Sequence, residues 1–426
     1  MINSKGLSFA SQFELKKLSI TAASSNKSYE LQNQYQELSL YEDIFSNTIY
    51  GTILIADSID LLSNMPIIGE ELVEIELLTP TMTKDIVKYK GYVYKVTDVV
   101  DTADKGKTYL IHFTSIETIL DANKKISKYF NGQISTIIDN IFHDANLLGS
   151  DKKLVVEETA NQIKFASPFW SPLKTINHLA SMSLTKKSKI PSYVFFETLR
   201  GDFNFVSINN LAAHEPKITY RKNTGHTRDT RNDGSIRNLD NEYSIIQTYY
   251  IDEMFDYLSR LKNGMYASRL ITANPISKTI KVTSQDYLNE FPKSNHLNKF
   301  PVMSSTAQRK KNASLNFVTN QEYSYDGQRN LRIDEWLLQR RSLLSQIHDV
   351  FRVDIEVNGR TDVHAGDTVN IEMMKAETSI KGDSNKQSQN NFYTGKFIVA
   401  AVHHRFADNR HTMCMQCVTD SFAKAL

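Results

Sequence analysis

Two stretches of this chain that lie far apart repeat one short pattern, and this repeat constrains the fold more than any other feature. The first stretch carries Val73, Ile75, Gly91 and Thr108, and the second carries Val369, Ile371, Gly395 and Thr412. In each stretch an alternating Val-x-Ile-Glu run comes first, a Gly precedes a long β-like run, and a Thr 17 residues after that Gly opens another alternating run. Such alternation is typical of half-buried strands. We therefore expect the chain to contain the same small β-unit twice.

The regions around the repeat predict the fold class. Short alternating runs joined by turn residues precede position 118, and β-like runs return after position 350, interrupted by a polar stretch at 378–391. This pattern predicts a mostly β fold with an α+β insert, in which two related small antiparallel β-barrels flank the inserted module. The expected divisions are 1–118 for the first tube-like barrel, 119–220 for the inserted α+β module, 221–330 for a linker, a helix and strands that contribute to the second barrel and to polar loops, and 331–426 for a helix and the second tube-like barrel.

Between the two β regions the hydrophobic period changes from two to about 3.6 residues, which is typical of amphipathic helices. Helices are predicted to begin at Ile134 and Pro172 and to cover Tyr249–Tyr266 and Ile333–Ile347. Two aromatic runs around Gly201 predict a hairpin. Residues 301–325, rich in Ser, Asn and Lys, are predicted to form an exposed loop.

Charge and composition exclude several classes of protein. The 426 residues include 50 Lys and Arg and 48 Asp and Glu, so a net charge of +2 excludes nucleic-acid binding driven by bulk charge. No run approaches the ~18 apolar residues that a membrane span needs, and no basic segment followed by an apolar core opens the chain. We therefore expect no membrane span and no signal peptide. Two Cys exclude a disulfide scaffold and fit a reducing compartment.

A duplicated barrel has a direct geometric consequence. Three chains around one axis would form a ring of six similar units, although the true symmetry would be threefold. Such a ring can meet a sixfold partner on one side and a threefold partner on the other. The repeat therefore favours an adaptor in a larger assembly.

The sequence resembles the baseplate hub protein of contractile-tailed phages of the T-even type. More remotely, it resembles the gp-D-like tail proteins and the base of the VgrG spikes of type VI secretion. The resemblance covers about residues 10–420, and it rests on the order and spacing of several segments. These are Gly-Glu-Glu-Leu-Val-Glu-Ile at 69–75, the Trp-x-Pro helix start at 169–176, the aromatic hairpin at 196–207, Gly-Asp-Thr-Val at 366–369 and the run 393–422.

The resemblance implies a homotrimeric hub that connects the tail tube to the central cell-puncturing spike and lines the ejection channel. The implied partners are further copies of the chain, the spike protein, tail tube or tube-initiator proteins and baseplate wedge proteins, while DNA passes through without specific binding. The implied location is the tail baseplate of the virion, after assembly in the host cytoplasm. No enzymatic activity and no cofactor or metal are expected. A phage tail, a secretion system and a tailocin remain open as contexts.

Acidic residues along the first repeat have two interpretations. Glu70, Glu71, Glu74 and Glu76, with Glu372 in the second repeat, could form a channel wall that repels DNA. The same pattern is equally typical of an ordinary solvated strand face.

Candidate catalytic and metal-binding residues are few. Cys414 and Cys417 form a CxxC near His403, His404 and His411, but the motif lies in an alternating strand, where residues three apart point to opposite faces. A structural role is favoured, with a zinc site as the alternative. His143 and His178 lie in predicted helices, where surface or core positions are the ordinary interpretation.

Two alternatives to the hub stay open, because paired carboxylates cannot be recognised from spacing alone. One is a tail-associated cell-wall hydrolase, and the other is a receptor- or carbohydrate-binding tail module. Nucleic-acid binding by the basic segment is a further alternative, with a protein-docking loop favoured because aromatic residues are not interleaved. This segment contains Arg221, Lys222, Arg228, Arg231 and Arg237, and a shorter basic run contains Arg309, Lys310 and Lys311.

Overall fold

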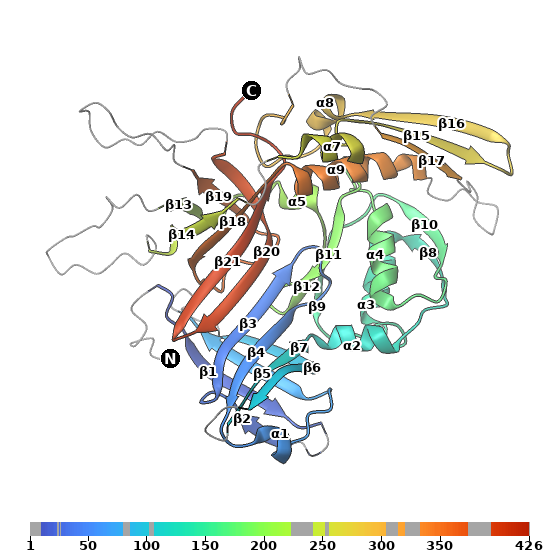
Figure 1. The fold of residues 1–426 in the computed structure, drawn as a ribbon. Coiled ribbons are helices and arrows are strands. Elements are labelled where there is room, and N and C mark those ends of the chain that lie inside the picture. Colours follow the sequence, from blue (N-terminus) through green and yellow to red (C-terminus); the bar gives the residue numbers. More distant parts are fainter. Residues whose placement is uncertain are drawn as a thin grey trace, which may run out of the picture.

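One long sheet runs through the molecule and joins its two β regions (Figure 1). The structure, a computed structural model, describes residues 10–23, 25, 27–79, 86–101, 106–222, 242–251, 255–303, 314–319, 333–373 and 393–425. The sheet has 13 strands in the order β19-β13-β14-β18-β21-β20-β3-β4-β7-β6-β5-β1-β2. The mostly β fold predicted from the sequence is confirmed.

The first β region is a curled sheet that encloses its own core. Its strands are β1 (Glu14–Thr21), β2 (Ser28–Glu30), β3 (Tyr35–Asp43), β4 (Tyr50–Asp57), β5 (Leu72–Leu78), β6 (Val87–Asp101) and β7 (Lys107–Thr114), with the short helix α1 (Leu61–Asn64) between β4 and β5. Every second residue of β5 points inward, as the alternation of Val73, Glu74 and Ile75 predicts. Leu18 of β1 and Leu38 of β3 share the core, yet no pairing joins these two strands within the described residues. The curl therefore stays open there.

The second β region closes into a barrel. Its strands are β13 (Thr219–Lys222), β14 (Ile245–Tyr250), β18 (Phe351–Asn358), β19 (Thr368–Glu372), β20 (Gly395–Ala407) and β21 (Arg410–Thr419). Pairing of β19 with β20 completes a closed ring of six strands. The barrel differs from the predicted antiparallel form at one strand, because β13 runs parallel to both β14 and β19. Two parallel pairs let this strand of four residues bridge the ends of the sheet.

The inserted module folds as the helical and aromatic patterns predict. Its elements are α2 (Ile116–Asn123), β8 (Tyr129–Gln133), α3 (Ile134–His143), β9 (Lys153–Val156), β10 (Gln162–Ala166), α4 (Pro172–Met182), β11 (Tyr193–Glu197), β12 (Asp202–Ser207) and α5 (Ile208–Leu211). Pro172 begins α4, where a missing N–H leaves no helical hydrogen bond unmade. The β11–β12 hairpin turns at Gly201, whose φ of 85° favours glycine. The apolar faces of α3 and α4 pack on this hairpin in one core.

A third region, here called the arm, projects beside the insert (Figure 1). It consists of α7 (Tyr257–Asn263), β15 (Ala267–Asn274), β16 (Thr279–Asp286), α8 (Tyr287–Glu290), η1 (Phe291–Lys293), β17 (Ser314–Thr319), η2 (Ile333–Glu335) and α9 (Leu337–Asp349). Its three strands form a separate sheet in the order β16-β15-β17. Of the range 221–330, which was expected to contribute strands to the second barrel, it is β14 that does so.

Two local predictions in this part of the chain are wrong. The predicted helix Tyr249–Tyr266 is a strand through Tyr250, and its helix begins only at Tyr257. Apolar residues at i and i+4 fit a strand edge and a helix equally over so short a run. The predicted loop 301–325 contains β17, which pairs with β15. The polar stretch 378–391 lies outside the described residues.

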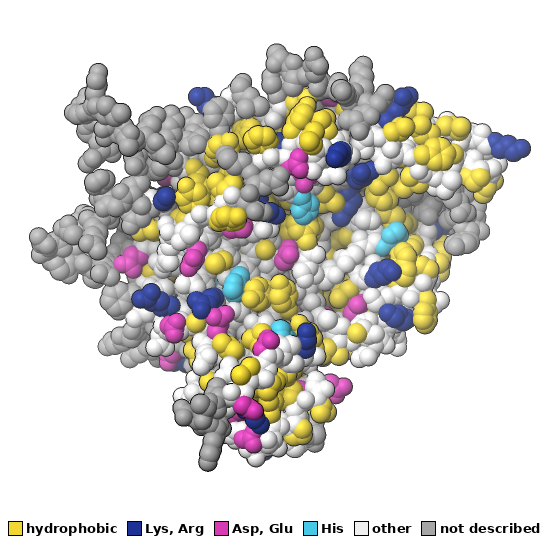
Figure 2. Space-filling model, in the orientation of Figure 1, with side chains coloured by type: hydrophobic (Ala, Val, Ile, Leu, Met, Phe, Trp, Pro, Cys, Tyr) yellow, Lys and Arg dark blue, Asp and Glu magenta, His cyan; other side chains and the backbone are white. Residues whose placement is uncertain are grey.

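One face of the arm sheet is apolar and open. Ile280 and Val282 of β16 and Leu315 and Phe317 of β17 are exposed on the face that turns away from α9. Figure 2 shows hydrophobic side chains gathered over this part of the molecule, while acidic and basic side chains are interspersed over the joined sheet. Among the described residues, α9 therefore packs on one face of this sheet, and the apolar face is exposed.

Candidate assembly site

The two β regions meet at a single pair of strands, here called the seam. Strand β3 of the first region pairs antiparallel with β20 of the barrel over seven residue pairs, from Asp43 opposite Ala401 to Glu37 opposite Ala407. Leu38 of β3 and Phe406 of β20 are fully buried on the inner face. On the outer face the rings of Tyr41 and His403 stack at 4.3 Å between centroids. Backbone pairing and packing on both faces thus make the junction continuous with the sheet.

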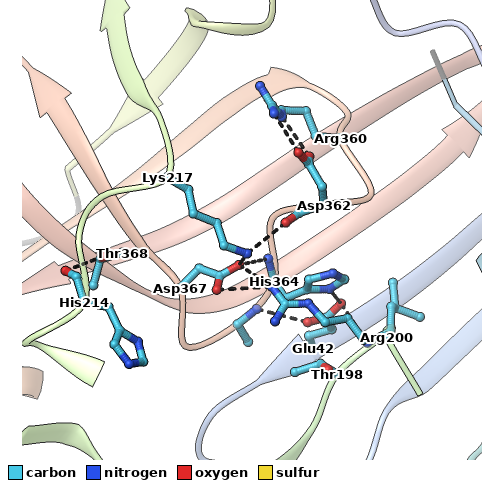
Figure 3. A network of polar contacts seen from close by, with 12 residues as sticks. Glu42, Thr198, Arg200, His214, Lys217, Arg360, Asp362, His364, Asp367 and Thr368 are labelled. Carbon is cyan, nitrogen blue, oxygen red and sulfur yellow. Dashed lines mark hydrogen bonds and ion pairs between the residues drawn. The ribbon is translucent and has the colours of Figure 1, made fainter. Parts of the chain in front are cut away.

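A buried carboxylate at the seam holds three regions together (Figure 3). The Glu42 side chain, at the end of β3, is completely buried. It accepts hydrogen bonds from the backbone N–H of Leu199 at 3.2 Å and of Ala365 at 3.0 Å, and it lies 3.0 Å from His364 Nδ1. These donors belong to the hairpin turn of the insert and to the loop before β19. Glu42 therefore connects the first sheet, the insert and the barrel.

Two opposing effects act on the pKa of the Glu42 carboxyl, namely its burial and its interactions with neighbouring histidines. Burial would raise the pKa of Glu42, but His364 and His404 outweigh it and hold the pKa well below the usual carboxyl range. His404 Nδ1 in turn lies 3.1 Å from His411 Nε2. Burial, reinforced by His404, lowers the pKa of His411 well below its ordinary value. The chain from Glu42 to His411 thus couples an anionic carboxylate to a neutral imidazole.

A second set of ion pairs surrounds this carboxylate closer to the surface (Figure 3). Asp367, directly before β19, lies 3.2 Å from the Arg200 guanidinium and 2.6 Å from Lys217 Nζ. Its carboxylate also accepts the backbone N–H of His364 at 2.9 Å. Lys217 donates further to the carbonyl oxygen of Asp362 at 3.0 Å. Asp367 therefore fixes the loop that presents His364 to Glu42.

The insert is anchored to the first sheet by a second buried network. Glu197 of β11 accepts the backbone N–H of Ile49 at 3.0 Å and the hydroxyl of Ser115 at 2.5 Å. Lys152 Nζ lies between Glu197 at 2.6 Å and Glu117 at 2.9 Å. Burial raises the pKa of Glu197, although Lys152 partly offsets this rise. Both carboxylates thus bind other groups of the protein, so this network serves as a structural junction.

The two β regions have the same strand order. Reading across the sheet, the first unit runs β3-β4-β7-β6-β5-β1 and the second unit runs β14-β18-β21-β20-β19-β13. In both units, therefore, the second strand along the chain is followed across the sheet by the third, sixth, fifth, fourth and first. Within each unit, β3 corresponds to β14 and β6 corresponds to β20.

Bulges in the pairing also fall at corresponding places. Two irregular steps of the first unit, Val93/Lys95 in β6 and Tyr35/Glu37 in β3, match Val399/Ala401 in β20 and Ile246/Thr248 in β14. The further steps Leu15/Lys17 in β1 and Thr97/Val100 in β6 have no printed counterpart in the second unit. A bulge adds one unpaired residue and increases the local twist of the strand. Two matched bulges therefore bend the two units at the same points.

The repeat residues can be placed against this correspondence. Val73 and Ile75 lie in β5, Val369 and Ile371 lie in β19, Gly91 lies in β6, Gly395 lies in β20, and Thr108 and Thr412 lie in β7 and β21. The four apolar residues are buried in the two cores. Thr108 lies opposite Ala56 of β4, and Thr412 lies opposite Asn358 of β18. Each matched pair thus occupies corresponding strands.

The match between the two glycines needs correction, because they differ in register by two residues. Gly91 lies opposite Val73, whereas Gly395 lies opposite Ile371. A Cβ atom at Gly91 would come within 2.6 Å of the Phe113 ring, and one at Gly395 would come within 2.4 Å of the Asn298 side chain. A larger residue at either position would therefore clash with a neighbouring side chain, and that neighbour differs between the two units.

The turns that precede β5 and β19 correspond more closely. Glu70 N–H donates to the carbonyl of Val93, and Gly366 N–H donates to the carbonyl of Val399. Glu70 has φ 91° and Gly366 has φ 87°. The next residue in each turn, Glu71 or Asp367, accepts backbone N–H groups with its carboxylate. Both turns thus combine a left-handed residue with an acidic cap.

The acidic strand face is neutralised in the structure, so it does not favour a wall that repels DNA. Glu74 lies between Lys17 and Lys90, and these lysines lower its pKa. Glu76 pairs with Lys88 at 3.3 Å. Ion pairing across neighbouring strands is typical of an ordinary solvated face.

Among the histidines singled out in the sequence, His404 and His411 lie in contact at the seam, 3.1 Å apart between ring nitrogens. Cys414 is exposed and Cys417 is buried, as their spacing along β21 predicts. No set of three or more potential metal ligands gathers within the described ranges. His143 is exposed on α3, and His178 packs against Trp170 with ring centroids 4.9 Å apart.

The basic segments are described only in part. Arg221 and Lys222 lie in β13, and Lys222 Nζ lies 4.9 Å from the ring centroid of Tyr249. Arg228, Arg231, Arg237 and the run Arg309, Lys310 and Lys311 lie outside the described residues. In the part of the chain that the structure covers, no helix is both long and apolar enough to cross a membrane.

Comparisons with known proteins bear on the fold. No family model matches the sequence, and no match was found among curated proteins. The tail protein from Neisseria meningitidis MC58 is similar in structure, with a TM-score of 0.56 and 11% identity over 97% of this chain and 100% of its own. The prophage MuSo2 43 kDa tail protein from Shewanella oneidensis has a TM-score of 0.53 and 11% identity, covering 95% of this chain and 98% of its own.

A prophage tail protein, gp18 from Listeria monocytogenes EGD-e, has a TM-score of 0.47 and 10% identity over 94% of each chain. The two stronger similarities span nearly the whole of this chain and of the other proteins. The chain therefore has the fold of these tail proteins, and the resemblance inferred from the sequence is confirmed at the level of the fold.

Proposed function

We propose that this chain is a structural component of a phage tail, a homotrimeric baseplate hub that connects the tail tube to the central spike. The observation that carries the proposal is the presence of two units with one strand order in a single chain, joined edge to edge at the seam. Two units per chain make a threefold ring equivalent to six units. This is the symmetry that an adaptor between a sixfold tube and a threefold spike needs.

Mechanically, the seam suits a part that transmits force. Seven residue pairs would carry load from one unit to the next through backbone hydrogen bonds, and Glu42 would resist rotation of one unit against the other. Removing one partner from a buried, hydrogen-bonded carboxylate is costly, so the junction tolerates little sliding. An obligate ring of such chains would bury on the order of 2,000 Å² or more at each contact.

The further partners of this hub follow from its place in the tail. They are the spike protein, tail tube or tube-initiator proteins and wedge proteins, and the ring would line the channel through which DNA passes without specific binding. Nearly equal numbers of acidic and basic residues support passage without retention. The hub would act without catalysis, in the baseplate of a virion assembled in the host cytoplasm.

The mass of the purified chain tests the proposal. At micromolar concentration we expect a species of three times the 48.7 kDa chain mass, and electron microscopy should show rings with six similar lobes. A strictly monomeric chain at 100 μM, or an enzyme-like clearing of cell-wall substrate by that monomer, would contradict the hub.

A further inference from the structure

Exposed apolar side chains concentrate on the arm. Of the 19 large apolar side chains that are exposed among the described residues, eight lie between positions 255 and 317. Four of these share the open face of the arm sheet, here called the arm face, and their exposed fractions are Ile280 71%, Val282 46%, Leu315 62% and Phe317 65%. Soluble proteins rarely expose a contiguous apolar patch unless another molecule binds there. The arm face is therefore a candidate binding surface.

Strand pairing places the side chains of the arm face beside one another. Ile271 of the central strand β15 lies opposite Val282 on one side and opposite Phe317 on the other. Ala273, the next residue of β15 that points to the same face, lies opposite Ile280. The arm face is thus one continuous apolar surface across three strands.

The orientation of the arm face follows from β17. The side chain of Asn316 accepts a hydrogen bond from the guanidinium of Arg341 in α9. Successive residues of a strand point to opposite faces, so Leu315 and Phe317 point away from α9. Leu270, which lies opposite Asn316, is 0% exposed on the covered face. Helix α9 therefore does not cover the arm face.

The outer end of the arm face is held in a defined turn. Strands β15 and β16 are joined by residues 275–278. The buried side chain of Asn274 accepts the backbone N–H groups of Ile276 at 3.0 Å and of Ser277 at 3.2 Å. Ile276 is 72% exposed at this end. An apolar side chain on a turn that is already fixed loses little conformational freedom when a partner binds.

A cation lies at each end of the arm face. Arg269 lies opposite Leu315 at the inner end, and Lys278 lies in the turn at the outer end. Within the described residues neither side chain has an ion pair, and Nε of Arg269 is buried without a hydrogen-bond partner. Lys281, by contrast, is paired with Asp334. The two ends of the arm face therefore carry positive charge that the described part of this chain does not neutralise.

The strands of the arm supply almost no negative charge. Strands β15 and β17 contain no acidic residue, and Asp286, the last residue of β16, accepts the backbone N–H of Asn289 at the start of α8. Between the two cations the face is hydrocarbon except for a hydroxyl at Thr319, which lies opposite Ala273. Sites for sugars or nucleotides need several convergent polar groups. The complementary ligand is therefore apolar in the middle and acidic at both ends.

The size of the arm face limits what fits on it. Three strands about 4.8 Å apart make a surface roughly 10 Å wide, which is the diameter of one α-helix. From Arg269 to the turn the surface is roughly 20 Å long at about 3.3 Å per residue, which a helix of about 13 residues spans. The exposed patch is on the order of 500 Å², below the roughly 800 Å² per partner of a standard interface between folded proteins.

We propose that the arm face binds an amphipathic helix of a partner protein, about 13 residues long, with one apolar stripe and acidic residues at both ends. The helix would lie opposite α9, so that the arm sheet is packed between two helices. Apolar contact would supply the affinity, and the two cations would fix the position of the helix along the sheet. The inference is independent of the hub ring, because the arm sheet shares no strand with the two β units.

Two designed peptides test this proposal with the full-length chain. Both are helical, about 13 residues long, and carry the same Leu stripe, but one has Glu at both ends and the other has Lys at both ends. Fluorescence anisotropy of the labelled peptides at low ionic strength would measure their dissociation constants. We expect the peptide with Glu ends to bind wild type at least tenfold more tightly than the peptide with Lys ends.

A variant of the arm face tests the apolar part of the contact. Phe317→Asp should weaken binding of the peptide with Glu ends at least tenfold, because it places a carboxylate in the middle of the apolar surface. The matched control is Ile68→Asp, at a side chain that is 72% exposed outside the arm, which should leave the dissociation constant within twofold. Thermal unfolding of both variants should match wild type within a few degrees, which separates lost binding from lost folding.

Reversing the two cations tests the charge complementarity. In the double variant Arg269→Glu and Lys278→Glu the preference should reverse, so that the peptide with Lys ends binds more tightly than the peptide with Glu ends. Equal affinity of the two peptides for wild type, or an unchanged preference in the double variant, would overturn the proposed partner.

The remaining outcomes assign the arm face to other occupants. Wild type that binds neither peptide but sediments with vesicles containing 30% phosphatidylglycerol, in a manner lost in Phe317→Asp, would overturn the helix in favour of a lipid surface. Loss of self-association in Phe317→Asp would overturn it in favour of a second copy of the chain. A chain that is monomeric yet binds the peptide with Glu ends as expected would overturn the hub and support the helix contact.

Discussion

The first and second β units share a strand order but differ in closure. In the second unit β13 pairs with both β14 and β19 and closes the barrel. In the first unit the corresponding strand, β1, runs antiparallel to β5 and pairs on its outer side with β2. The two units thus differ in the direction of one strand and, among the described residues, in whether six strands form a closed ring.

The units also differ in what surrounds the edge that each presents. Strand β20 carries His404 and Phe406 into a packed seam, whereas the equivalent part of β6 carries exposed valines and aspartates. The two equivalent strands therefore differ in their surroundings, because β20 is paired with β3 whereas this part of β6 has exposed side chains. Three predictions, from the largest expected effect to the smallest, test how far the equivalence extends.

The largest effect is expected from a charge in either core. Val93 and Val399 are the residues before the matched bulges and are at most 1% exposed. Val93→Asp and Val399→Asp should each cost more than about 4 kcal/mol, because a buried carboxylate without partners is costly. Urea unfolding followed by circular dichroism would measure the free energy of unfolding.

The control for this pair is Ile280→Asp in the exposed face of the arm, where we expect a change within about 0.5 kcal/mol. Because the seam joins the cores, each core variant should destabilise the whole chain in one transition. Unchanged stability of Val399→Asp would argue against the second barrel, and separate transitions would show that the seam does not couple the units.

An intermediate effect is expected from acidification, because the histidine network belongs to one side of the seam only. His411 has a pKa well below its ordinary value when folded, so the unfolded chain binds the extra proton. The stability that His411 provides is therefore present above about pH 6.5 and is lost as the pH falls. We expect the contribution of His411 to the free energy of unfolding to fall by about 1.4 kcal/mol per pH unit between pH 6 and 5.

The lowered pKa of Glu42 adds a second loss below about pH 4.3, where the unfolded carboxyl takes up a proton before the folded one. In His411→Gln the slope between pH 6 and 5 should flatten, and in exposed His143→Gln it should not. Urea unfolding across this pH range measures both. An unchanged slope in His411→Gln would show that His411 does not cause this pH dependence.

The smallest effect concerns the two corresponding turns. Gly366→Ala should cost about 1 kcal/mol, because φ is 87° and the added Cβ would lie 2.8 Å from the Phe196 ring. Glu70→Gly, at φ 91° in the first unit, should change stability by less than about 1 kcal/mol. Thermal unfolding would measure both, and equal losses in the two variants would mean that the turns are not equivalent.

Much of the local structure could be predicted from the sequence, because it depends on neighbouring residues. Alternation around Val73 predicts β5, and Pro172 after Ser171 marks the start of α4. The segment around Tyr249 was assigned to a helix because its apolar spacing fits both periods, and only pairing with β18 makes it a strand. The sequence match between Gly91 and Gly395 is wrong by two residues of register. A shift of two residues keeps each side chain on the same face of the strand, so the alternation alone does not reveal it.

The assembly site was not predictable in the same way. Glu42 has no motif around it, and its partners come from residues 199, 364 and 365. An acidic residue at the end of an alternating apolar run is the only local signal. Asp367 was included in the Gly-Asp-Thr-Val segment that supported the resemblance, but its contacts with Arg200 and Lys217 depend on the insert.

Local periodicity was therefore sufficient to establish the β content, the insert and the presence of two related units, since side-chain alternation and turn preferences act over a few residues. The closure of one unit and the β3–β20 seam emerged only from tertiary structure. Strand pairing joins residues hundreds of positions apart, and its register depends on bulges and buried partners that no short segment contains.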